Sequence, residues 1–450
     1  MAKKDAQKRY FIITFGCQMN EHDSEAIAGI LESEGYIRAE DKEDADLLIV
    51  NTCAVRRKAE LKVLALIGRL RPLKEKKPEM LIAVCGCMAQ QKEVAEYLEK
   101  RFQHLVDLIF GTFAIPRLPE LLQEARDKKG TVIDIVEVDE GREGILVKRE
   151  DDLKAWVTIT YGCNNFCSYC IVPYVRGREK SRNPKDILRE VKQLGKEGFK
   201  EVTLLGQNVN SYGKDLEMEI TFAALLRELN KVEGIKRIRY MTSHPRDFTD
   251  ELIEVIRDGE KICEHFHLPL QAGSNRILEK MNRGYSRERY LELVSKIREQ
   301  IPDSAITTDL IVGFPGETEE DFADTIDMVE RIRFDSAFTF VYSKRSGTPA
   351  AEMEDQVPEE EKKRRIAVLI DLQNRITREL NENLVGSVQE VLVEGVKGED
   401  PDTYTGRTRT NKIVNFKADD SFALAKGELC LVKIEAEQTW NLNGKYLKTI

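Results

Sequence analysis

Continuous apolar runs alternate with amphipathic stretches over the first quarter of the chain. The runs lie at residues 10–15, 46–50, 80–84 and 106–110, and each precedes a stretch with helical periodicity. Strands that are apolar throughout are buried on both faces, which is typical of a parallel sheet covered by helices on both sides. Residues 1–126 are therefore predicted to form a doubly wound parallel sheet domain.

The alternation of strands and helices resumes after residues 127–150, which are rich in charge and glycine and predict a linker with one short extended piece. Apolar runs follow near residues 155–159, 201–205, 237–241, 265–268, 305–312 and 336–342. Six strand-helix units are fewer than the eight of a closed α/β barrel. Residues 151–384 are thus predicted to form an open (β/α)6 barrel, with its chemistry at the carboxyl ends of the strands.

The pattern changes to short strands in the last part of the chain. Five β runs lie at residues 388–396, 404–408, 413–416, 429–436 and 446–450, separated by glycine and Asn-Gly turns. This spacing predicts a small antiparallel β-barrel over residues 385–450. The fold class is therefore α/β with three domains.

Composition narrows the class of protein. The chain has 450 residues, a hydrophobic fraction of 41% and a net charge of −9. We find no apolar run long enough to span a membrane and no secretory signal, so we expect a cytoplasmic protein whose cysteines stay reduced. The negative charge argues against a uniformly basic nucleic-acid coat, but it leaves local basic patches at residues 69–77, 176–182, 236–239 and 362–365.

Cys163, Cys167 and Cys170 form a CxxxCxxC motif directly after the first core strand. Three thiolates from one tight loop can hold three corners of an iron-sulfur cube and leave the fourth iron open. The alternative is a structural zinc site, which needs four ligands, and no further Cys or His lies nearby in the sequence.

A second group of cysteines lies in the N-terminal domain. Cys17, Cys53 and Cys87 each follow one of the first three strands. Ligands of such sheets bind beyond the carboxyl ends of the strands, so this placement predicts a second metal centre with an open coordination position. The alternative is that the three are ordinary buried thiols. We assign the remaining cysteines to packing; they are Cys85, Cys263 and Cys430.

Several other residues near these motifs each have two possible roles. His244 is either a general acid or base or a structural histidine, and the glycines at 313–316 either approach a ligand or form a tight turn. The arginines beyond the cysteine loop are candidates to contact a carboxylate or an RNA phosphate; they are Arg176, Arg178 and Arg182.

Several motifs together resemble one family. The loop YGCNNFCSYC, with Tyr169 before its third cysteine, resembles the signature of radical S-adenosylmethionine (SAM) enzymes. FGCQMNEHDSE, NTCAVR and CGCMAQ resemble the N-terminal domain of methylthiotransferases, and GRTRTNKIVNF resembles their C-terminal TRAM domain. Over nearly its whole length the chain is thus similar to radical SAM methylthiotransferases, and FGCQMN and NTCAVR favour the tRNA-modifying MiaB type.

The resemblance implies two 4Fe-4S clusters and SAM as cofactors. The cluster on Cys163, Cys167 and Cys170 would cleave SAM to a 5'-deoxyadenosyl radical, and the other triad would hold an auxiliary cluster. It also implies that SAM contacts come from the strand-end turns, at Gln207, Ser243, Gln271, Ser274 and Asp309.

The implied activity is addition of a methylthio group to C2 of N6-dimethylallyladenosine, beside the anticodon of tRNA. Arg407, Arg409 and Lys412 of the small barrel are expected to contact RNA phosphates. The expected partners are tRNA, a reducing electron donor and a sulfur source, with no membrane and a monomeric chain.

Two alternatives to this activity remain open at this point. The first is a related methylthiotransferase acting on threonylcarbamoyl-adenosine or on a ribosomal protein. The second is a non-enzymatic iron-sulfur protein that binds RNA or carries electrons.

Overall fold

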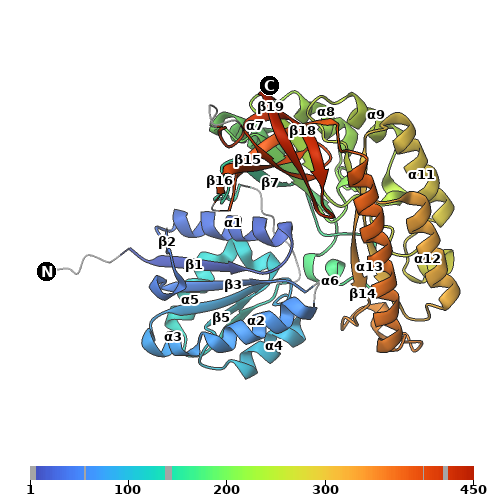
Figure 1. Cartoon of the computed structure of the whole chain (residues 1–450). Helices are drawn as coiled ribbons and strands as arrows, with labels where there is room; N and C mark the ends of the chain where they lie inside the picture. The colour runs from blue at the N-terminus through green and yellow to red at the C-terminus, as the bar shows by residue number, and fades with distance from the viewer. Residues whose placement is uncertain (1–6, 55–56, 137–143, 399, 419–423) are drawn as a thin grey trace. The chain divides into compact units, whose positions relative to one another are not determined.

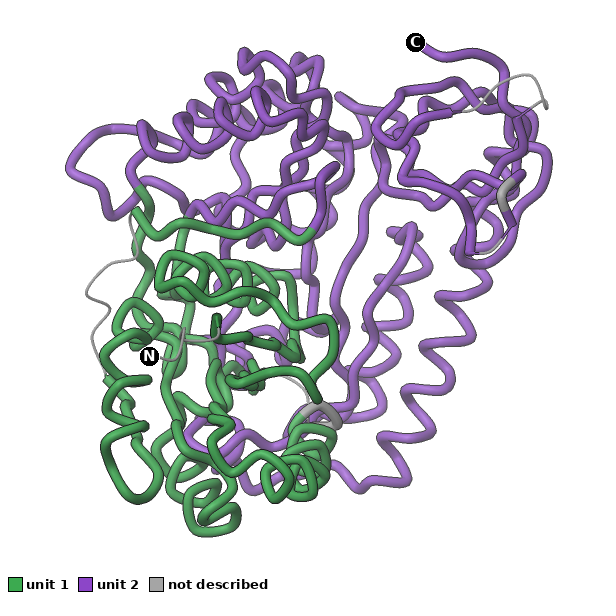
Figure 2. The backbone as a smooth tube through the Cα atoms, turned by 90° about the vertical axis from the view of Figure 1, so that its left-hand side faces the viewer, with its two compact units in different colours: residues 1–150, 160–166, 170–182 green, residues 151–159, 167–169, 183–450 purple. Residues whose placement is uncertain are grey.

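The chain divides into two compact units in the computed structural model (Figures 1 and 2). Unit 1 comprises residues 1–150, 160–166 and 170–182, and unit 2 comprises residues 151–159, 167–169 and 183–450. The structure describes residues 7–54, 57–136, 144–398, 400–418 and 424–450, so residues 137–143 of the predicted linker lie outside the described part.

Unit 1 is built on a six-stranded sheet with the order β2-β1-β3-β4-β5-β6. All of its strand pairs are parallel, which confirms the predicted sheet. The strands are β1 (Arg9–Thr14), β2 (Ile37–Arg38), β3 (Leu47–Thr52), β4 (Leu81–Gly86), β5 (Leu108–Phe110) and β6 (Val132–Asp134). The edge strand β6 comes from the segment that the sequence predicts as a linker.

Helices cover both faces of this sheet because successive residues of its strands point to opposite sides. Leu47 and Ile49 pack with residues of α1 (Gln18–Ser33) and α5 (Leu118–Asp127), whereas Leu48 and Val50 pack with α2 (Arg57–Arg69) and α4 (Lys92–Arg101). Figure 1 shows α1 on one side of the sheet and α2 and α4 on the other. The short helix α3 (Arg71–Lys76) follows α2.

The cysteine-loop segments that belong to unit 1 form a small hairpin-like element. β8 (Thr160–Tyr161) pairs antiparallel with β9 (Lys180–Ser181), and the short helix α6 (Val172–Arg176) lies between them in the sequence. Gly162 has a φ of +65°, and a Cβ there would come within 2.1 Å of the Arg178 carbonyl oxygen. Only glycine fits this position without a shift of the backbone.

Unit 2 contains the six predicted core strands as two parallel sheets. One has the order β11-β10-β7 and the other the order β12-β13-β14. The backbone N–H of Ser243, just after β11, donates to the carbonyl oxygen of His267 at the end of β12, which joins the two sheets. The strands are β7 (Lys154–Thr158), β10 (Glu201–Leu205), β11 (Arg237–Tyr240), β12 (His265–His267), β13 (Ala305–Val312) and β14 (Ser336–Val341).

The core helices begin where side chains can bond the free N–H groups of the first turn. Asn183, Thr221, Thr249, Ser286 and Thr318 each accept such a bond before a helix. The helices are α7 (Pro184–Glu197), α8 (Phe222–Asn230), α9 (Asp250–Asp258), α10 (Asn275–Lys280), α11 (Arg287–Gln300), α12 (Glu319–Ile332) and α13 (Glu359–Glu382). Among the described residues, no helix combines the length and apolar character that a membrane crossing requires.

The C-terminal strands close into a barrel with the order β15-β16-β17-β19-β18. They are β15 (Val388–Lys397), β16 (Asp400–Thr408), β17 (Ile413–Lys417), β18 (Leu429–Glu437) and β19 (Asn441–Thr449). The prediction of a wholly antiparallel barrel is wrong for one pair, because β17 and β19 run parallel. With five strands, alternating directions cannot be kept around a closed ring, so one pair must be parallel.

Two buried arginines of β11 fasten the barrel to the core of unit 2. Arg237 is fully buried; it donates to the carbonyl oxygen of Arg407 at 2.6 Å and to the carboxylate of Glu390 at 2.9 Å. Arg239 donates to the carbonyl oxygens of Thr408 and Arg409, both at 2.8 Å. The barrel therefore supplies the acceptors that these guanidinium groups need in a buried site.

Replacing Arg237 with Met should destabilise this junction by about 3 kcal/mol, since Glu390 would lose its buried partner. We expect faster hydrogen exchange of the β15 and β16 amides and a lower urea midpoint. The control is Arg257→Met, because Arg257 pairs with Asp258 in solvent, with side chains 44% and 65% exposed. Its urea midpoint should stay close to that of the parent protein, and equal losses in both variants would contradict the role of Arg237.

Candidate functional site

Cys17, Cys53 and Cys87 lie at the carboxyl ends of three neighbouring strands of unit 1, as the sequence predicts. Cys17 is the N-cap residue of α1, three residues after β1 ends. Cys53 directly follows β3, and Cys87 directly follows β4. Cys17 is exposed, whereas Cys53 and Cys87 are buried.

The Cys17 and Cys87 side chains both contact Asn20, and Cys53 lies close to them. The Cys17 sulfur lies 3.5 Å from the Asn20 Oδ1 atom, and the Cys87 sulfur lies 4.0 Å from the same atom. A Cβ at Gly16 would come within 3.0 Å of the Cys53 Cβ, so the first strand end closely approaches the second. Three loops therefore bring three thiols to one place.

Asn20 is held in a fully buried amide network. Its Nδ2 group donates to the carbonyl oxygen of Thr52 at 2.9 Å and to the side-chain oxygen of Asn51 at 3.2 Å. Asn51 in turn donates to the Asn20 carbonyl and to Ser24. Because each amide orients the other, Asn20 Oδ1 is directed toward the cysteines.

Arg176 reaches the same place from α6. Its Nε group donates to the Cys87 sulfur at 3.2 Å, and its Nη2 group donates to Asp23 at 2.8 Å and to Asn20 at 3.2 Å. Arg176 and Asp23 are 5% and 1% exposed, so this is a buried ion pair. The expectation that Arg176 contacts a SAM carboxylate or an RNA phosphate is thus replaced by a role inside unit 1.

The chemistry of this donor set suits a metal cluster. Burial raises the pKa of the Cys87 thiol to about 12, although Arg176 acts in the opposite direction, so the free thiol is protonated at neutral pH. Metal binding would deprotonate it. Within the described residues, no three His, Cys, Asp or Glu side chains lie close enough to share a single metal ion. Cluster thiolates each bind a different iron, and three gathered cysteines fit that arrangement.

The CxxxCxxC cysteines are divided between the two units. Cys163 and Cys170 belong to unit 1, and Cys167 belongs to unit 2. In unit 1 the backbone N–H of Cys163 donates to the Gly177 carbonyl oxygen at 3.1 Å. Arg178 lies over the ring of Phe166, 4.4 Å from its centroid, so this side chain too has a partner in its own unit.

Arg283 holds Cys167 in unit 2. Its Nη1 group donates to the Cys167 sulfur at 3.3 Å, and its other nitrogens donate to the Pro269 carbonyl and the Tyr285 hydroxyl. Arg283 is 4% exposed. Sequence reasoning missed this residue because it stands in a helix-to-helix connection that carries no recognisable motif. Each cysteine triad thus has one sulfur that accepts a hydrogen bond from a buried arginine.

Four of the five residues expected to bind SAM follow the carboxyl ends of core strands, and the fifth, Asp309, lies within β13. Ser243 Oγ and Gln271 Oε1 are buried and have no hydrogen-bond partner among the described residues. Gln207 is half-buried. Ser274 donates to Asp321 at 2.5 Å, and Asp309 lies 3.6 Å from the His267 Nε2 atom. Buried polar atoms without partners are rare in folded proteins, so Ser243 and Gln271 fit a site that a polar ligand completes.

His244 is buried beside these groups and is neutral. Its Nδ1 atom accepts from the Arg246 backbone N–H at 3.3 Å, so the proton is on Nε2, which is buried without a partner in the described structure. Burial and the charges of Arg283 and Arg246 lower the His244 pKa to about 2. The imidazole is therefore neutral at neutral pH, which favours a structural histidine with a fixed N–H donor.

The backbone at these strand ends is strained. Thr242 and Gln271, which are not glycines, have φ values of +67° and +72°. Such conformations persist where the surrounding structure imposes them, and they cluster at ligand sites. The glycine segment at 313–316 turns sharply, with φ values of +73° at Gly313 and +76° at Gly316, and a Cβ at Gly313 would come within 2.3 Å of the Lys362 side chain.

The three residues expected to contact RNA phosphates are paired inside unit 2. Arg409 binds Glu264 through two nitrogens at 2.9 and 2.7 Å. Lys412 binds Asp335 at 2.8 Å, and Arg407 binds Glu394 at 3.2 Å. The ion pairs of Arg409 and Lys412 therefore attach the barrel to the core, whereas that of Arg407 lies within the barrel. RNA binding by these residues stays a prediction.

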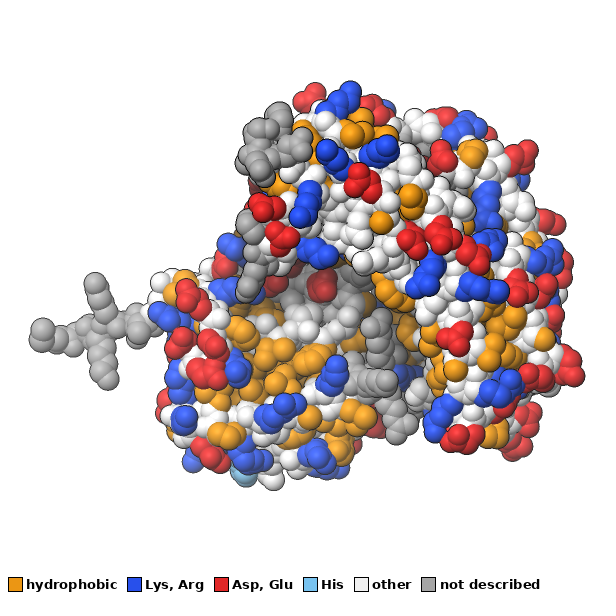
Figure 3. Space-filling view, in the orientation of Figure 1, with side chains coloured by type: hydrophobic (Ala, Val, Ile, Leu, Met, Phe, Trp, Pro, Cys, Tyr) orange, Lys and Arg blue, Asp and Glu red, His pale blue; other side chains and the backbone are white. Residues whose placement is uncertain are grey.

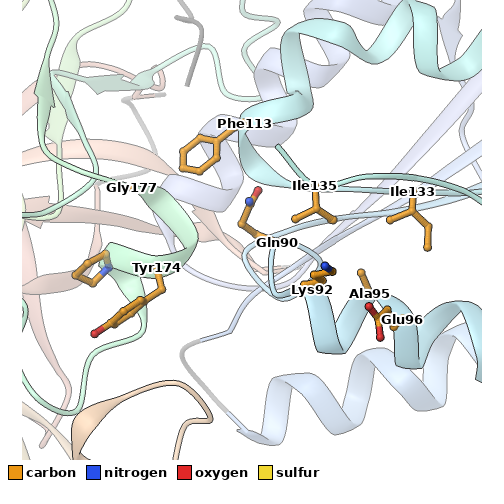
Figure 4. Close-up of a pocket in the computed structure, with 10 residues that line it drawn as sticks. Gln90, Lys92, Ala95, Glu96, Phe113, Ile133, Ile135, Tyr174 and Gly177 are labelled. Atoms are coloured by element: carbon orange, nitrogen blue, oxygen red, sulfur yellow. The ribbon is translucent and has the colours of Figure 1, made fainter. Parts of the chain in front are cut away.

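Unit 1 also has an open pocket of about 630 Å³, between α4, the edge strand β6 and α6. Figure 4 shows Tyr174 of α6 at one end, Phe113 and Gln90 in the middle, and Lys92 and Glu96 of α4 at the other end. None of the candidate cluster cysteines is among the described residues that line it. It is thus a separate feature from the cysteine sites.

Three segments of the chain each match a known protein family. Residues 9–111 match the model of an uncharacterized protein family, UPF0004, residues 157–329 match the radical SAM superfamily, and residues 382–447 match the TRAM domain. A radical SAM methyltransferase of known structure, TsrM from Kitasatospora setae with cobalamin and a [4Fe-4S] cluster bound, shares the fold with a TM-score of 0.56. It is 14% identical, over 88% of this chain and 82% of that one.

Relatives of much higher identity cover nearly the whole chain. The tRNA-2-methylthio-N(6)-dimethylallyladenosine synthase of Acetivibrio thermocellus is 58% identical over 99% of this chain and 92% of its own length. The enzymes of the same name from Natranaerobius thermophilus and Carboxydothermus hydrogenoformans are each 57% identical, over 97% and 98% of this chain and 96% and 99% of their own lengths. The chain therefore belongs to the family of tRNA-2-methylthio-N(6)-dimethylallyladenosine synthases, within the radical SAM enzymes.

Proposed function

We propose that this protein adds a methylthio group to C2 of N6-dimethylallyladenosine beside the anticodon of tRNA. The observation that carries the proposal is the presence of two separate cysteine triads in a chain that is 58% identical to an enzyme of that name. In this proposal residues 1–126 hold an auxiliary cluster, 127–150 form a linker, 151–384 form the radical SAM core and 385–450 form the TRAM domain.

The bound cofactors would supply a carbon-centred radical, which C2 of adenine requires because no side-chain base can remove its unactivated hydrogen. Cys163, Cys167 and Cys170 would hold the cluster that donates an electron to SAM, and Cys17, Cys53 and Cys87 would hold a second cluster. The residues of the chain bind, orient and shield these groups.

Ser243, His244 and Gln271 support the SAM site. Each has a buried polar atom without a partner among the described residues, at neighbouring strand ends. A ligand with hydroxyl, amino and carboxylate groups offers partners for a hydroxyl, an N–H donor and an amide oxygen. An electron carrier has no use for such a site, and equilibrium SAM binding separates the two functions.

The remaining parts of the proposal concern partners. The reaction needs a reducing electron donor and a source of the replacement sulfur, and we propose a cytoplasmic monomer that works without a membrane.

The test of the function is mass spectrometry of tRNA nucleosides from cells that lack the gene. The methylthio nucleoside should be absent there and should return when the gene is restored. Its persistence would overturn the proposal.

Replacing Cys163, Cys167 and Cys170 together with Ala should leave about four of about eight irons per chain after anaerobic reconstitution. SAM cleavage should be lost, because the remaining cluster lies in the N-terminal domain. Iron and sulfide assays with Mössbauer spectroscopy measure this outcome.

The matched variant replaces Cys17, Cys53 and Cys87. It should also keep about four irons, yet it should still cleave SAM and form no methylthio product. Replacing Cys85, Cys263 and Cys430 serves as the control for loss of thiols and should keep all the iron. Eight irons in either of the first two variants would disprove two independent clusters.

Replacing Arg176 with Met should lower the reduction potential of the auxiliary cluster, because the Cys87 sulfur loses a hydrogen bond and a nearby positive charge. The measurement is a redox titration followed by electron paramagnetic resonance, in the background that lacks the CxxxCxxC cysteines. The double variant Arg176→Met/Asp23→Leu avoids an unpaired buried carboxylate. An unchanged potential in a fully loaded double variant would show that Arg176 only packs.

His244 makes the protein less stable as the pH falls. Its pKa is about 2 in the folded chain and about 6.5 when unfolded, so the unfolded state binds the extra proton. Stability is retained above pH 6.5 and should decrease by about 1.3 kcal/mol between pH 7 and pH 5.5. His244→Gln should lack this part of the pH dependence. Parallel urea midpoints over this range in both proteins would contradict a buried neutral histidine.

A further inference from the structure

The three cations of the barrel's basic loop already have carboxylate partners, Arg409 and Lys412 in the core and Arg407 within the barrel, so a second group of cations on the barrel is better placed to bind RNA phosphates. Arg407, Arg409 and Lys412 all pair with acidic residues of unit 2. The face drawn in Figure 3 carries acidic and basic side chains interspersed. With a net charge of −9, the chain has no general attraction for a polyanion, and a local cationic group must supply it.

Alternation along the barrel strands separates inward from outward side chains. Val414 and Phe416 of β17, and Val432 and Ile434 of β18, belong to the apolar core of the barrel. Residues between or directly after them point outward. Lys417, Lys433 and Lys445 occupy such positions and are exposed. We call these three residues the lysine row.

Strand register makes this set a continuous row. Lys417 of β17 is the direct partner of Lys445 of β19 in the parallel pair, and Lys445 is the direct partner of Lys433 of β18 in the antiparallel pair. Direct partners have Cβ atoms about 5 Å apart. The row ends at uncharged neighbours, Thr403 on β16 and Val388 on β15.

The lysine row should lower the stability of the barrel on its own. Like charges directly opposite each other on a sheet destabilise it. None of the three lysines has an ion-pair or hydrogen-bond partner within the part of the chain that the structure describes. Among the described acidic residues, Glu435 lies two positions along β18 from Lys433, and the pKa of Asp400 is lowered mainly by Thr403 and to a smaller extent by Lys417. Neither forms an ion pair with the row.

We propose that the lysine row is the surface of the barrel that binds the phosphate backbone of the tRNA. The inference rests on the proposed function, and it assigns the RNA contact to Lys417, Lys433 and Lys445. Three ammonium groups in a row across neighbouring strands can contact successive phosphates of a nucleic-acid backbone. A bound polyanion also removes the repulsion between the three positive charges.

The experiment compares two triple variants of the full-length, reconstituted enzyme. One is Lys417→Gln/Lys433→Gln/Lys445→Gln. The control is Lys185→Gln/Lys192→Gln/Lys196→Gln, which removes the same charge from exposed, unpaired positions of α7. A tRNA transcript carrying N6-dimethylallyladenosine is titrated at several salt concentrations, with polyglutamate as a second polyanion.

Loss of three phosphate contacts should lower the salt slope of tRNA binding by about 2 to 3 units in the first variant and leave the control unchanged. An unchanged slope in the first variant, or an equal change in both, would overturn the proposal. Polyglutamate binding as tight as tRNA binding, lost in the same variant, would also overturn it, since the row would then be a general polyanion surface.

Two further readouts separate a binding role from a structural one. The urea midpoint of the first variant should be unchanged or raised, because like-charge repulsion is removed, and SAM cleavage without tRNA should persist. A lowered midpoint would mean that the row supports the fold. If the parent protein cleaves SAM but neither binds nor modifies the tRNA, the proposed function fails; if only the variant comparison fails, the lysine row alone is wrong.

Discussion

A parallel sheet brings the carboxyl ends of all its strands to one edge, and the chemistry of this protein depends on that constraint. In unit 1 the ends of β1, β3 and β4 carry Cys17, Cys53 and Cys87. In unit 2 the ends of β11 and β12 carry Ser243 and Gln271, whose buried polar atoms lack partners within the described chain. Neither site needs residues that are close in sequence, because the strand ends themselves gather the ligands.

Buried arginines occur at both cysteine sites and at the junction between the barrel and the core. Arg176 and Arg283 each donate to a cysteine sulfur, and Arg237 donates to acceptors of the barrel. A guanidinium group is costly to bury, and each of these has several fixed acceptors that offset the loss of water. The geometry of such a site is specified by many bonds at once, so a small displacement of the cysteine loop or the barrel would leave several groups unsatisfied.

Much of this arrangement could be predicted from sequence periodicity. The core strands agree with the structure to within a residue or two, and Cys85 could be assigned to packing because it lies one residue after an apolar run and two before Cys87. Contacts between distant segments could not be foreseen. Arg409 pairs with Glu264, which lies 145 residues earlier in the chain. The lysine row likewise depends on which strands become neighbours: β17 and β19 are adjacent in the barrel although β18 separates them in sequence.

The position of β19 in the barrel has a consequence for the order of folding. β19 is hydrogen-bonded on both sides, to β17 and to β18, so the ring stays open until this strand, the last in chain order, has joined it. During synthesis the core of unit 2 is complete well before β19 leaves the ribosome. The carbonyl groups that accept from Arg237 and Arg239 lie 169 or 170 residues later in the chain, so both guanidinium groups stay in contact with water until that segment has been synthesised and docked.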